Sequence, residues 1–357
     1  MTVLVYEAVS GGGLGPGDWP ASWLAEGSAI RRALVADFAA VPGVRVVEPV
    51  DPRGPNADAP APAGVTRILA DPARPIDPAR LARRVDAAVL VAPETGGRLE
   101  TLARDWAATR VPTLGATPDA IALCADKLRL AAHLDRLGIP TPPTRAGRFD
   151  RGLLAGQTGR VVVKPVDGAG AVDSFVLDPS GCDPDAYPEL RAYPTLLVQP
   201  YRPGPALGAT FLIGRDGGAT LLAVGRQDVA LGPRGAIRYD GGTVPIPAGG
   251  LDLAPARATV ESVPGLLGLV GVDLVAVGPS GAVEVIEINP RATTSIVGLA
   301  RLAPPGTIAR AWLAAVLGDD WGDGGDSARA DLAAIADAPP VRFRADGTIP
   351  DPHEVTS

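Results

Sequence analysis

Oxygen-bearing side chains gather at the end of one apolar segment, EVIEINPR (284–291). Glu287 and Asn289 are two residues apart, so on a β-strand they project from the same face. Asp273 stands fourteen residues before Glu287 in a second apolar segment, GVDLVAV. Carboxylate and amide oxygens suit magnesium, which also binds the phosphate oxygens of substrates. A sheet with a solvated face would explain any one of these carboxylates. The whole set, followed by Arg291, instead predicts a metal site formed by Asp273, Glu287 and Asn289.

Two lysines stand where they could meet phosphate groups. Lys164 ends the apolar segment VVVKP (161–165), and a loop with Gly168, Ala169 and Gly170 follows. The backbone N–H groups of such a loop can cradle a terminal phosphate. The pattern is not a Walker motif, because the lysine precedes the glycines and no GK[ST] follows. An ordinary hairpin turn stays an alternative for the loop, and a solvated helical lysine stays one for Lys127.

Two further segments are candidates for ligand contact. The segment LLVQPYRPG (196–204) is an apolar strand that runs into a Pro/Gly hinge. The backbone at Gln199, Pro200 and Tyr201 could therefore offer its polar groups to the edge of an adenine ring. Arg226 follows another apolar strand, where a substrate or phosphate contact and a merely solvated position are equally open.

The elements that must position these residues fall into two patterns. Strands and helices alternate over the first ~115 residues, which indicates a doubly wound parallel sheet. After residue 117, two helices lead to Leu137, and β-like segments then dominate. The segments VDLVAVG and AVEVIEINP predict a hairpin through Pro279–Gly281. The strands expected are 2–9, 44–50, 65–70, 87–93, 111–115, 161–165, 175–177 and 196–201, with β-rich chain from 209, and the helices are 20–40, 78–85, 97–109, 254–269 and 306–317.

This pattern predicts an α/β protein whose later part is α+β, organised in four parts. They are an N-terminal α/β domain (1–116), a central subdomain with the glycine-rich loop (117–200), a subdomain with the metal site (201–320) and a tail (321–357). The tail is acidic and rich in Gly and Ala, then rich in Pro. Such a composition buries little apolar surface, so we expect the tail to be loosely held.

The order of these motifs resembles the ATP-grasp superfamily over roughly residues 117–300. Lys127, Lys164 with its glycine loop, the 199–201 hinge and the Asp/Glu/Asn set fill the family's positions in sequence. The resemblance implies an ATP-grasp fold, in which a pre-ATP-grasp domain precedes two subdomains that clasp ATP. It also implies that both lysines contact ATP phosphates and that two magnesium ions, with manganese as an alternative, neutralise the transferred γ-phosphoryl group.

Three positions depart from the family pattern. Gln199 replaces a usual glutamate, Ala206 stands where a ribose-binding glutamate is common, and Gly271 stands where an arginine often precedes the metal-binding aspartate. The last departure moves the oxyanion-stabilising role to Arg291 or Arg226. Together with Lys164, these arginines are the expected catalytic residues.

The reaction implied is ADP-forming ligation of a carboxylate to an amine through an acyl phosphate. The segments VYEAVSGGG, 20–27, YDGGTVPIP and EINPRATTS resemble the tyramine–glutamate ligase branch, which serves methanofuran-type (methylofuran) cofactor biosynthesis. That resemblance implies glutamate and a primary amine as substrates. A peptide or amino-acid ligase with another acceptor and a non-catalytic nucleotide-binding protein remain alternatives.

Composition excludes several other classes. The net charge of −7 without a basic cluster argues against a nucleic-acid partner. No apolar run approaches the length of about eighteen residues needed to span a membrane, and the N-terminus resembles a first strand rather than a signal peptide. Two cysteines without a CxxC motif give no disulfide framework. We therefore expect a cytoplasmic protein that acts on small molecules; whether it is a homodimer stays open.

Overall fold

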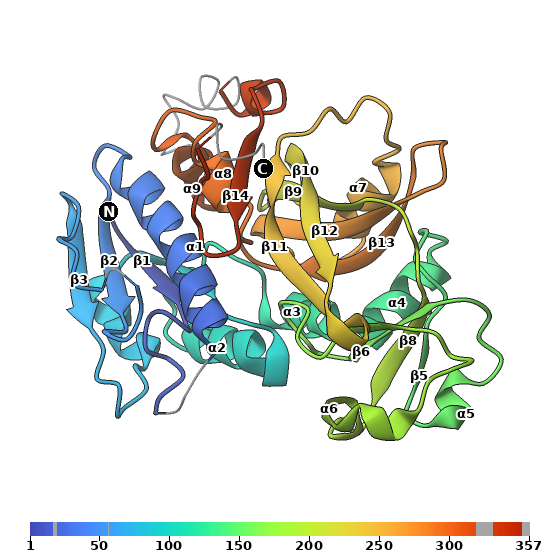
Figure 1. Ribbon diagram of the computed structural model, residues 1–357. Helices are drawn as coiled ribbons and strands as arrows, with labels where there is room; N and C mark the ends of the chain where they lie inside the picture. Colours follow the sequence, from blue (N-terminus) through green and yellow to red (C-terminus); the bar gives the residue numbers. More distant parts are fainter. Residues whose placement is uncertain (17–19, 56, 319–330, 352–357) are drawn as a thin grey trace.

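A four-stranded parallel sheet forms the N-terminal part of the computed structural model, which describes residues 1–16, 20–55, 57–318 and 331–351. The strand order is β3-β2-β1-β4 (Figure 1). Odd and even residues of β1 join different cores, since Val3 and Val5 pack with α1 whereas Leu4 and Tyr6 pack with α2. The sheet is therefore covered on both faces, as predicted. Its elements are β1 (Thr2–Glu7), α1 (Ala21–Ala39), β2 (Arg45–Val50), β3 (Val65–Leu69), η1 (Pro78–Arg84), β4 (Ala87–Val91), η2 (Thr95–Gly97) and α2 (Arg98–Ala107).

The direction of winding reverses beside β1. From β1 the chain passes through α1 to β2 on one side, and after β3 it returns to β4 on the other side. The loops that leave the carboxyl ends of β1 and β4 therefore diverge. Such a reversal leaves a crevice in which open α/β sheets bind their ligands.

Two short helices link this sheet to the rest of the chain. They are α3 (Pro118–Ala125) and α4 (Lys127–Arg136). The boundary between them is Asp126, whose carboxylate accepts hydrogen bonds from the N–H groups of Leu128 (3.1 Å) and Arg129 (3.0 Å). An aspartate that caps a helix in this way satisfies N–H groups that have no partner within the helix. This cap fixes Lys127 as the first residue of α4.

A small antiparallel sheet of order β5-β8-β6-β7 follows. Short helices cover it around a core of its own that includes Phe149, Val161 and Val198. The loop between β6 and β7 carries the predicted glycine-rich segment. The elements are β5 (Arg145–Gly147), α5 (Arg151–Leu154), β6 (Val161–Pro165), β7 (Phe175–Leu177), η3 (Pro184–Ala186), α6 (Pro188–Arg191) and β8 (Leu196–Pro200).

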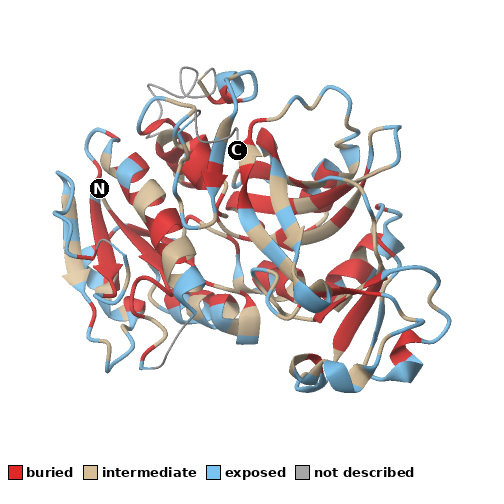
Figure 2. Cartoon of the chain, viewed as in Figure 1, coloured by how far each residue is buried: buried red, intermediate tan, exposed pale blue. Residues whose placement is uncertain are grey.

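A larger antiparallel sheet, of order β13-β12-β9-β10-β11-β14, completes the molecule. The predicted hairpin is confirmed: β12 and β13 pair antiparallel, and Asp273 lies opposite Glu287. Figure 2 shows buried stretches in its strands alternating with half-buried and exposed ones, the latter mainly on β10 and β11. The elements are β9 (Ala206–Ile213), β10 (Ala219–Leu231), η4 (Pro233–Gly235), β11 (Ile237–Val244), α7 (Ala254–Glu261), β12 (Gly268–Val277), β13 (Ala282–Asn289), α8 (Ile296–Leu299), α9 (Thr307–Leu317) and β14 (Val341–Arg344).

Part of the expected tail is instead built into this sheet. Strand β14 pairs antiparallel with β11. Leu332, Ile335 and Phe343 are buried in the same core as α1 and α9. The composition did not predict this because large apolar side chains are few in the segment and lie among Ala, Asp and Pro. Residues 319–330 and 352–357 lie outside the described structure.

Two other expectations need correction. The segment 111–115 forms only a single bridge, between Thr113 and Ala88, rather than a strand. The helix expected over 254–269 ends at Glu261, and the turn that follows leads directly into β12. Within the described ranges, no helix is long and apolar enough to cross a membrane.

Candidate functional site

A cleft of about 300 Å³ opens between the small and the large antiparallel sheets. Residues from β6, β8, β9, β10, β11, β12, β13 and the glycine-rich loop line it. Of the thirteen predicted site residues, twelve line this cleft. They are Lys127, Lys164, Gly168, Gly170, Gln199, Pro200, Tyr201, Arg226, Asp273, Glu287, Asn289 and Arg291. The remaining one, Ala169, lines a smaller cavity next to it.

Lys127 bridges three parts of the fold. Its Nζ atom lies 2.9 Å from Glu287 Oε2 on β13 and donates to the carbonyl oxygen of Gly168 at 2.5 Å. Burial alone would lower the pKa of Lys127, but the charge and hydrogen bond of Glu287 outweigh burial and raise it. Lys127 is buried, so the alternative of a solvated helical lysine is wrong.

Lys164 is the second buried ammonium group of the cleft. It lies on β6 and makes no hydrogen bond or ion pair within the described part of the chain. Burial lowers its pKa to about 8; the nearby Glu287 opposes this shift and Lys127 adds to it. A buried cation without a protein partner is costly, and an anionic ligand in the cleft would remove that cost.

Lys127 and Lys164 are the only lysines of the chain; every other residue counted among the 33 Lys and Arg is an arginine. Both lie in the same cleft. An ammonium group is a compact point charge on a flexible stem, whereas a guanidinium group is a planar fork of five donors. The cleft therefore contains both lysine side chains of the protein, and every cationic side chain of the Lys/Arg type elsewhere is an arginine.

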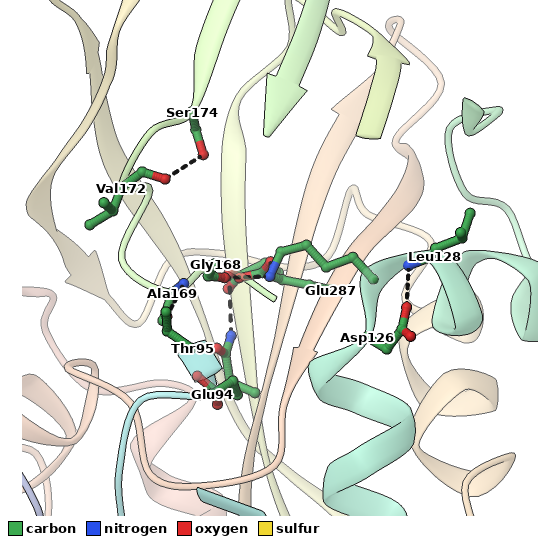
Figure 3. A network of polar contacts seen from close by, with 12 residues as sticks. Glu94, Thr95, Asp126, Leu128, Gly168, Ala169, Val172, Ser174 and Glu287 are labelled. Carbon is green, nitrogen blue, oxygen red and sulfur yellow. Dashed lines mark hydrogen bonds and ion pairs between the residues drawn. The ribbon is translucent and has the colours of Figure 1, made fainter. Parts of the chain in front are cut away.

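The glycine-rich loop is held by hydrogen bonds to η2, the short helix that follows β4. The Ala169 N–H donates to Thr95 Oγ1 (3.1 Å), and the Gly96 N–H donates to Asp167 Oδ2 (2.9 Å). Figure 3 shows Thr95 and Glu94 next to Ala169, with Glu287 pointing toward Gly168 from the other side. The loop is thus a structured cover over the lysines rather than a plain hairpin turn. The Ala169 N–H, expected to face phosphate, is engaged with Thr95.

The predicted metal set comes together as expected. Asp273 and Glu287 are hydrogen-bonded to each other. Asp273 also accepts hydrogen bonds from Gln227 Nε2 (2.8 Å) and Asn289 Nδ2 (3.3 Å). Burial, and then the charge of Glu287, raises the pKa of Asp273; Lys127 and Lys164 overcome burial and lower the pKa of Glu287.

This donor set fits a divalent cation. Two adjacent carboxylates repel each other when both are charged, and a cation between them removes that repulsion. A magnesium ion would supply this charge and bind hard oxygen ligands from two strands. No group of three or more His, Cys, Asp or Glu side chains that could hold a metal was found in the described ranges. Protein oxygens alone therefore do not complete a cage, which suits a metal that also binds substrate phosphates.

The hinge after β8 lines the cleft as predicted, with one correction. The Tyr201 N–H donates to the carbonyl oxygen of Arg160 (2.9 Å), so it is not available to a ligand. The Arg160 guanidinium also lies 4.8 Å above the Tyr201 ring. The side chain of Gln199 is buried and donates to Thr144 Oγ1 (2.8 Å). This arrangement makes the hinge a rigid wall of the cleft.

The two arginines differ in their freedom to act. Arg291 is largely buried, with its side chain 13% exposed, and forms a bidentate pair with Glu94, with both nitrogen–oxygen distances at 2.9 Å. Arg226 is more than half exposed, and its nearest carboxylate oxygen, on Asp228, is 3.4 Å away. Arg226 can therefore reorient toward a charged ligand, whereas Arg291 is already neutralised.

Sequence reasoning missed several residues at this site. Glu26 on α1, Glu94 after β4 and Thr294 after β13 all meet Arg291 or the cleft. Tyr239, which the sequence left unplaced, lines the cleft and hydrogen-bonds to Thr294. One feature of the sequence could have identified Glu94 and Thr95. Both follow a fully apolar strand, and parallel sheets bind their ligands at the carboxyl ends of the strands.

Two models of protein families match parts of this chain. Residues 124–295 match the model of the ATP-grasp domain, and residues 44–121 match that of the pre ATP-grasp 3 domain. A search of curated proteins found no match.

Several solved structures share the fold. A putative ATP-grasp superfamily protein from Archaeoglobus fulgidus is 20% identical with a TM-score of 0.62, covering 96% of this chain and 92% of that one. The L-amino acid ligase of Bacillus licheniformis is 14% identical (TM-score 0.58, coverage 90% and 76%). The D-alanine–D-alanine ligase of Bacillus anthracis is 13% identical (TM-score 0.56, coverage 94% and 97%). The chain therefore has the ATP-grasp fold, and its residues 124–295 match the ATP-grasp domain.

Proposed function

We propose that this protein is an ATP-dependent ligase that joins a carboxylate to an amine through an acyl phosphate. The observation that carries the proposal is the placement of the only two lysines, both buried, beside Asp273 and Glu287 in one cleft. Such a site neutralises phosphate charge and holds reactants in place. It has no nucleophile–base pair of the kind that hydrolases need.

Each group has a separate task in this reaction. The Lys164 ammonium group has no partner among the described residues, so it is free to bind an ATP phosphate. Lys127 is held against Glu287 and Gly168, where the loop would cover the γ-phosphate. Asp273, Glu287 and Asn289 would hold magnesium or manganese, and two bound ions would supply positive charge to the β- and γ-phosphate oxygens. The rigid hinge at Gln199–Tyr201 would bind the adenine ring.

The bonds exchanged are then defined. A carboxylate oxygen bonds to the γ-phosphorus while the bond between that phosphorus and the β–γ bridging oxygen breaks, which releases ADP. An amine nitrogen then bonds to the acyl carbon, phosphate leaves, and the nitrogen loses a proton. Arg226, exposed at the edge of the cleft, is the candidate to stabilise the oxyanion of this second step. Arg291 orients Glu94 and its surroundings rather than reacting.

Candidate substrates come from two sources. The resemblance of this sequence to tyramine–glutamate ligases suggests glutamate as the carboxylate and a primary amine as the acceptor, within methylofuran-type cofactor biosynthesis in the cytoplasm. Two proteins of similar fold are an L-amino acid ligase and a D-alanine–D-alanine ligase. Amino acids as acceptors therefore belong in the same test.

The test measures ADP and phosphate release with MgATP across carboxylates and amines that include glutamate, tyramine and common amino acids. Hydroxylamine, added in place of the amine, traps an acyl phosphate as a hydroxamate. We expect ADP release to need a carboxylate and hydroxamate to form. Glu287→Gln should abolish both, whereas Glu261→Gln on the outer face of α7 should change neither.

A non-catalytic nucleotide-binding protein would give a different result. It would bind MgATP yet show no carboxylate-dependent ADP release with any pair. Failure to bind MgATP at all would contradict both readings of the cleft.

A further inference from the structure

A second cavity, of about 60 Å³, lies beside the main cleft at the N-terminal sheet. The carboxyl ends of β1 and β4 form one wall, with Val9, Val91 and Pro93. These are the two strands between which the winding of the sheet reverses, so the cavity occupies the crevice where open α/β sheets bind ligands.

The cavity is continuous with the proposed site of phosphoryl transfer. Glu26, Gly170 and Arg291 line both the cavity and the main cleft. The glycine-rich loop, through Ala169 and Gly170, forms its opposite wall. A group bound here would therefore lie next to the loop that covers the lysines, within reach of an acyl phosphate formed in the cleft.

Most charged groups around the cavity are already paired. The carboxylate of Glu7 accepts hydrogen bonds from the N–H groups of Val9 (3.1 Å) and Ser10 (2.7 Å). It also packs against α1 at Gly27, where a Cβ atom would lie only 2.2 Å from Glu7 Oε2. The Arg291–Glu94 pair neutralises itself. Neither pair leaves a group free to bind a substrate.

Glu26 is the exception. One carboxylate oxygen accepts a hydrogen bond from the Thr294 hydroxyl, and no cation pairs with Glu26 in the described part of the chain. The cavity wall beside it includes Trp23 and Ile30 on the same helix, and Arg291, which Glu94 already holds, contributes its charge nearby. The cavity thus offers the carboxylate of Glu26 beside an apolar wall, while Glu7 and Arg291 are held by other groups. A second carboxylate would be repelled there, whereas an ammonium group would be attracted.

We propose that this cavity is the acceptor-amine subsite, in which Glu26 binds the ammonium group of a primary amine. The inference rests on the proposed ligase function and adds which substrate lies where. The small volume holds the ammonium and a few adjoining carbon atoms, and larger acceptors extend into the main cleft. Glu26 is then a specificity-determining residue that selects amines over carboxylates and alcohols.

A binding experiment tests the subsite without requiring turnover. Alkylamines from methylamine to pentylamine, tyramine, and the matching alcohols are titrated into the protein with MgADP, by calorimetry and saturation-transfer NMR. We expect at least one amine to bind more tightly than its alcohol. Glu26→Gln should weaken that amine by about tenfold to a hundredfold, since hydrogen bonds to charged groups are strong, and Glu26→Asp should recover part of the loss. Glu261→Gln is the matched control on an exposed helix face.

Two results would overturn the proposal: no amine of the series binds the wild-type protein, or Glu26→Gln binds amines as the wild type does. Hydroxamate formation separates this outcome from failure of the ligase function, because hydroxylamine is small and uncharged at neutral pH. Glu26→Gln should lower amide formation far more than hydroxamate formation, mainly through the KM for the amine. If Glu26→Gln lowers amide formation and hydroxamate formation equally, Glu26 acts in phosphoryl transfer, and the proposed amine subsite is wrong.

Discussion

The Nζ atom of Lys127 lies 2.9 Å from Glu287 Oε2 and only 2.5 Å from the carbonyl oxygen of Gly168. One side chain therefore joins α4, β13 and the glycine-rich loop. A phosphate that enters the cleft must share or replace these contacts. This relationship couples nucleotide binding to the position of the loop, and it makes the identity of the two lysines testable.

Arginine should not replace either lysine. Lys127→Arg and Lys164→Arg keep the charge but put a planar fork into a space that holds a buried ammonium. We expect each to lower substrate-dependent ADP release by roughly 100-fold, the effect of losing one preorganised donor to developing charge. Circular dichroism should show an unchanged fold, and Arg104→Lys on the surface of α2 is the control. Activity within threefold of wild type in either variant would contradict the assigned role.

Lys164 should be unusually reactive toward amine reagents. With a pKa of about 8, about half of its side chains are neutral at pH 8, against roughly 0.3% for an ordinary lysine. Because the chain has only two lysines, mass spectrometry after brief reductive methylation resolves each site. We expect Lys164 to be labelled before Lys127, whose pKa is raised, and MgATP to protect it. Labelling of Lys164 that first appears above pH 10 would disprove the lowered pKa.

The Arg291–Glu94 pair should be important for stability. Glu94→Gln removes the bidentate partner of the largely buried Arg291 guanidinium, and breaking such a pair typically costs about 3–5 kcal/mol. Chemical denaturation measures the loss, and Arg291→Met in the same chain should restore part of it. Glu100→Gln, which breaks a largely exposed pair with Arg104, should cost less than about 1 kcal/mol. Equal losses for the two glutamates would show that the buried pair is not formed.

Phe343 should be essential for docking of the C-terminal segment. Its ring is 3% exposed and lies against Gly298 and Gly242, where Cβ atoms would come within 3.0 and 3.3 Å of ring atoms. Phe343→Ala removes this packing, and we expect a loss of about 3–5 kcal/mol in the free energy of unfolding. Leu231→Ala, at an exposed position of β10, is the control. Wild-type stability in Phe343→Ala would mean that β14 does not pack in solution as described.

The cysteines should differ in reactivity. Burial raises the pKa of the Cys124 thiol far above its ordinary value, whereas Cys182 is only half-buried. A thiol reagent at pH 8 should therefore modify at most one cysteine in the folded protein and both after denaturation. Rapid modification of both thiols in the native state would contradict the packing of α3.

The sequence by itself determined the parts that depend on local order along the chain. Alternating strands and helices gave the parallel sheet, and a two-residue spacing put Glu287 and Asn289 on one face of a strand. The lysines and the hinge were found because each ends or begins an apolar element. These patterns depend only on residues that are close together in the chain, so they can be recognised in a single sequence.

Only the tertiary structure decided which charges are free. Arg291 and Arg226 were equal candidates in the sequence, but Glu94, 197 residues away from Arg291, neutralises one of them. Glu26 belongs to no sequence motif. It lines the cavity because α1 packs beside β1, where the winding of the sheet reverses. Phe343 became part of the core through pairing of β14 with β11. In each case the interaction energy comes from partners distant in sequence, whose approach no local pattern encodes.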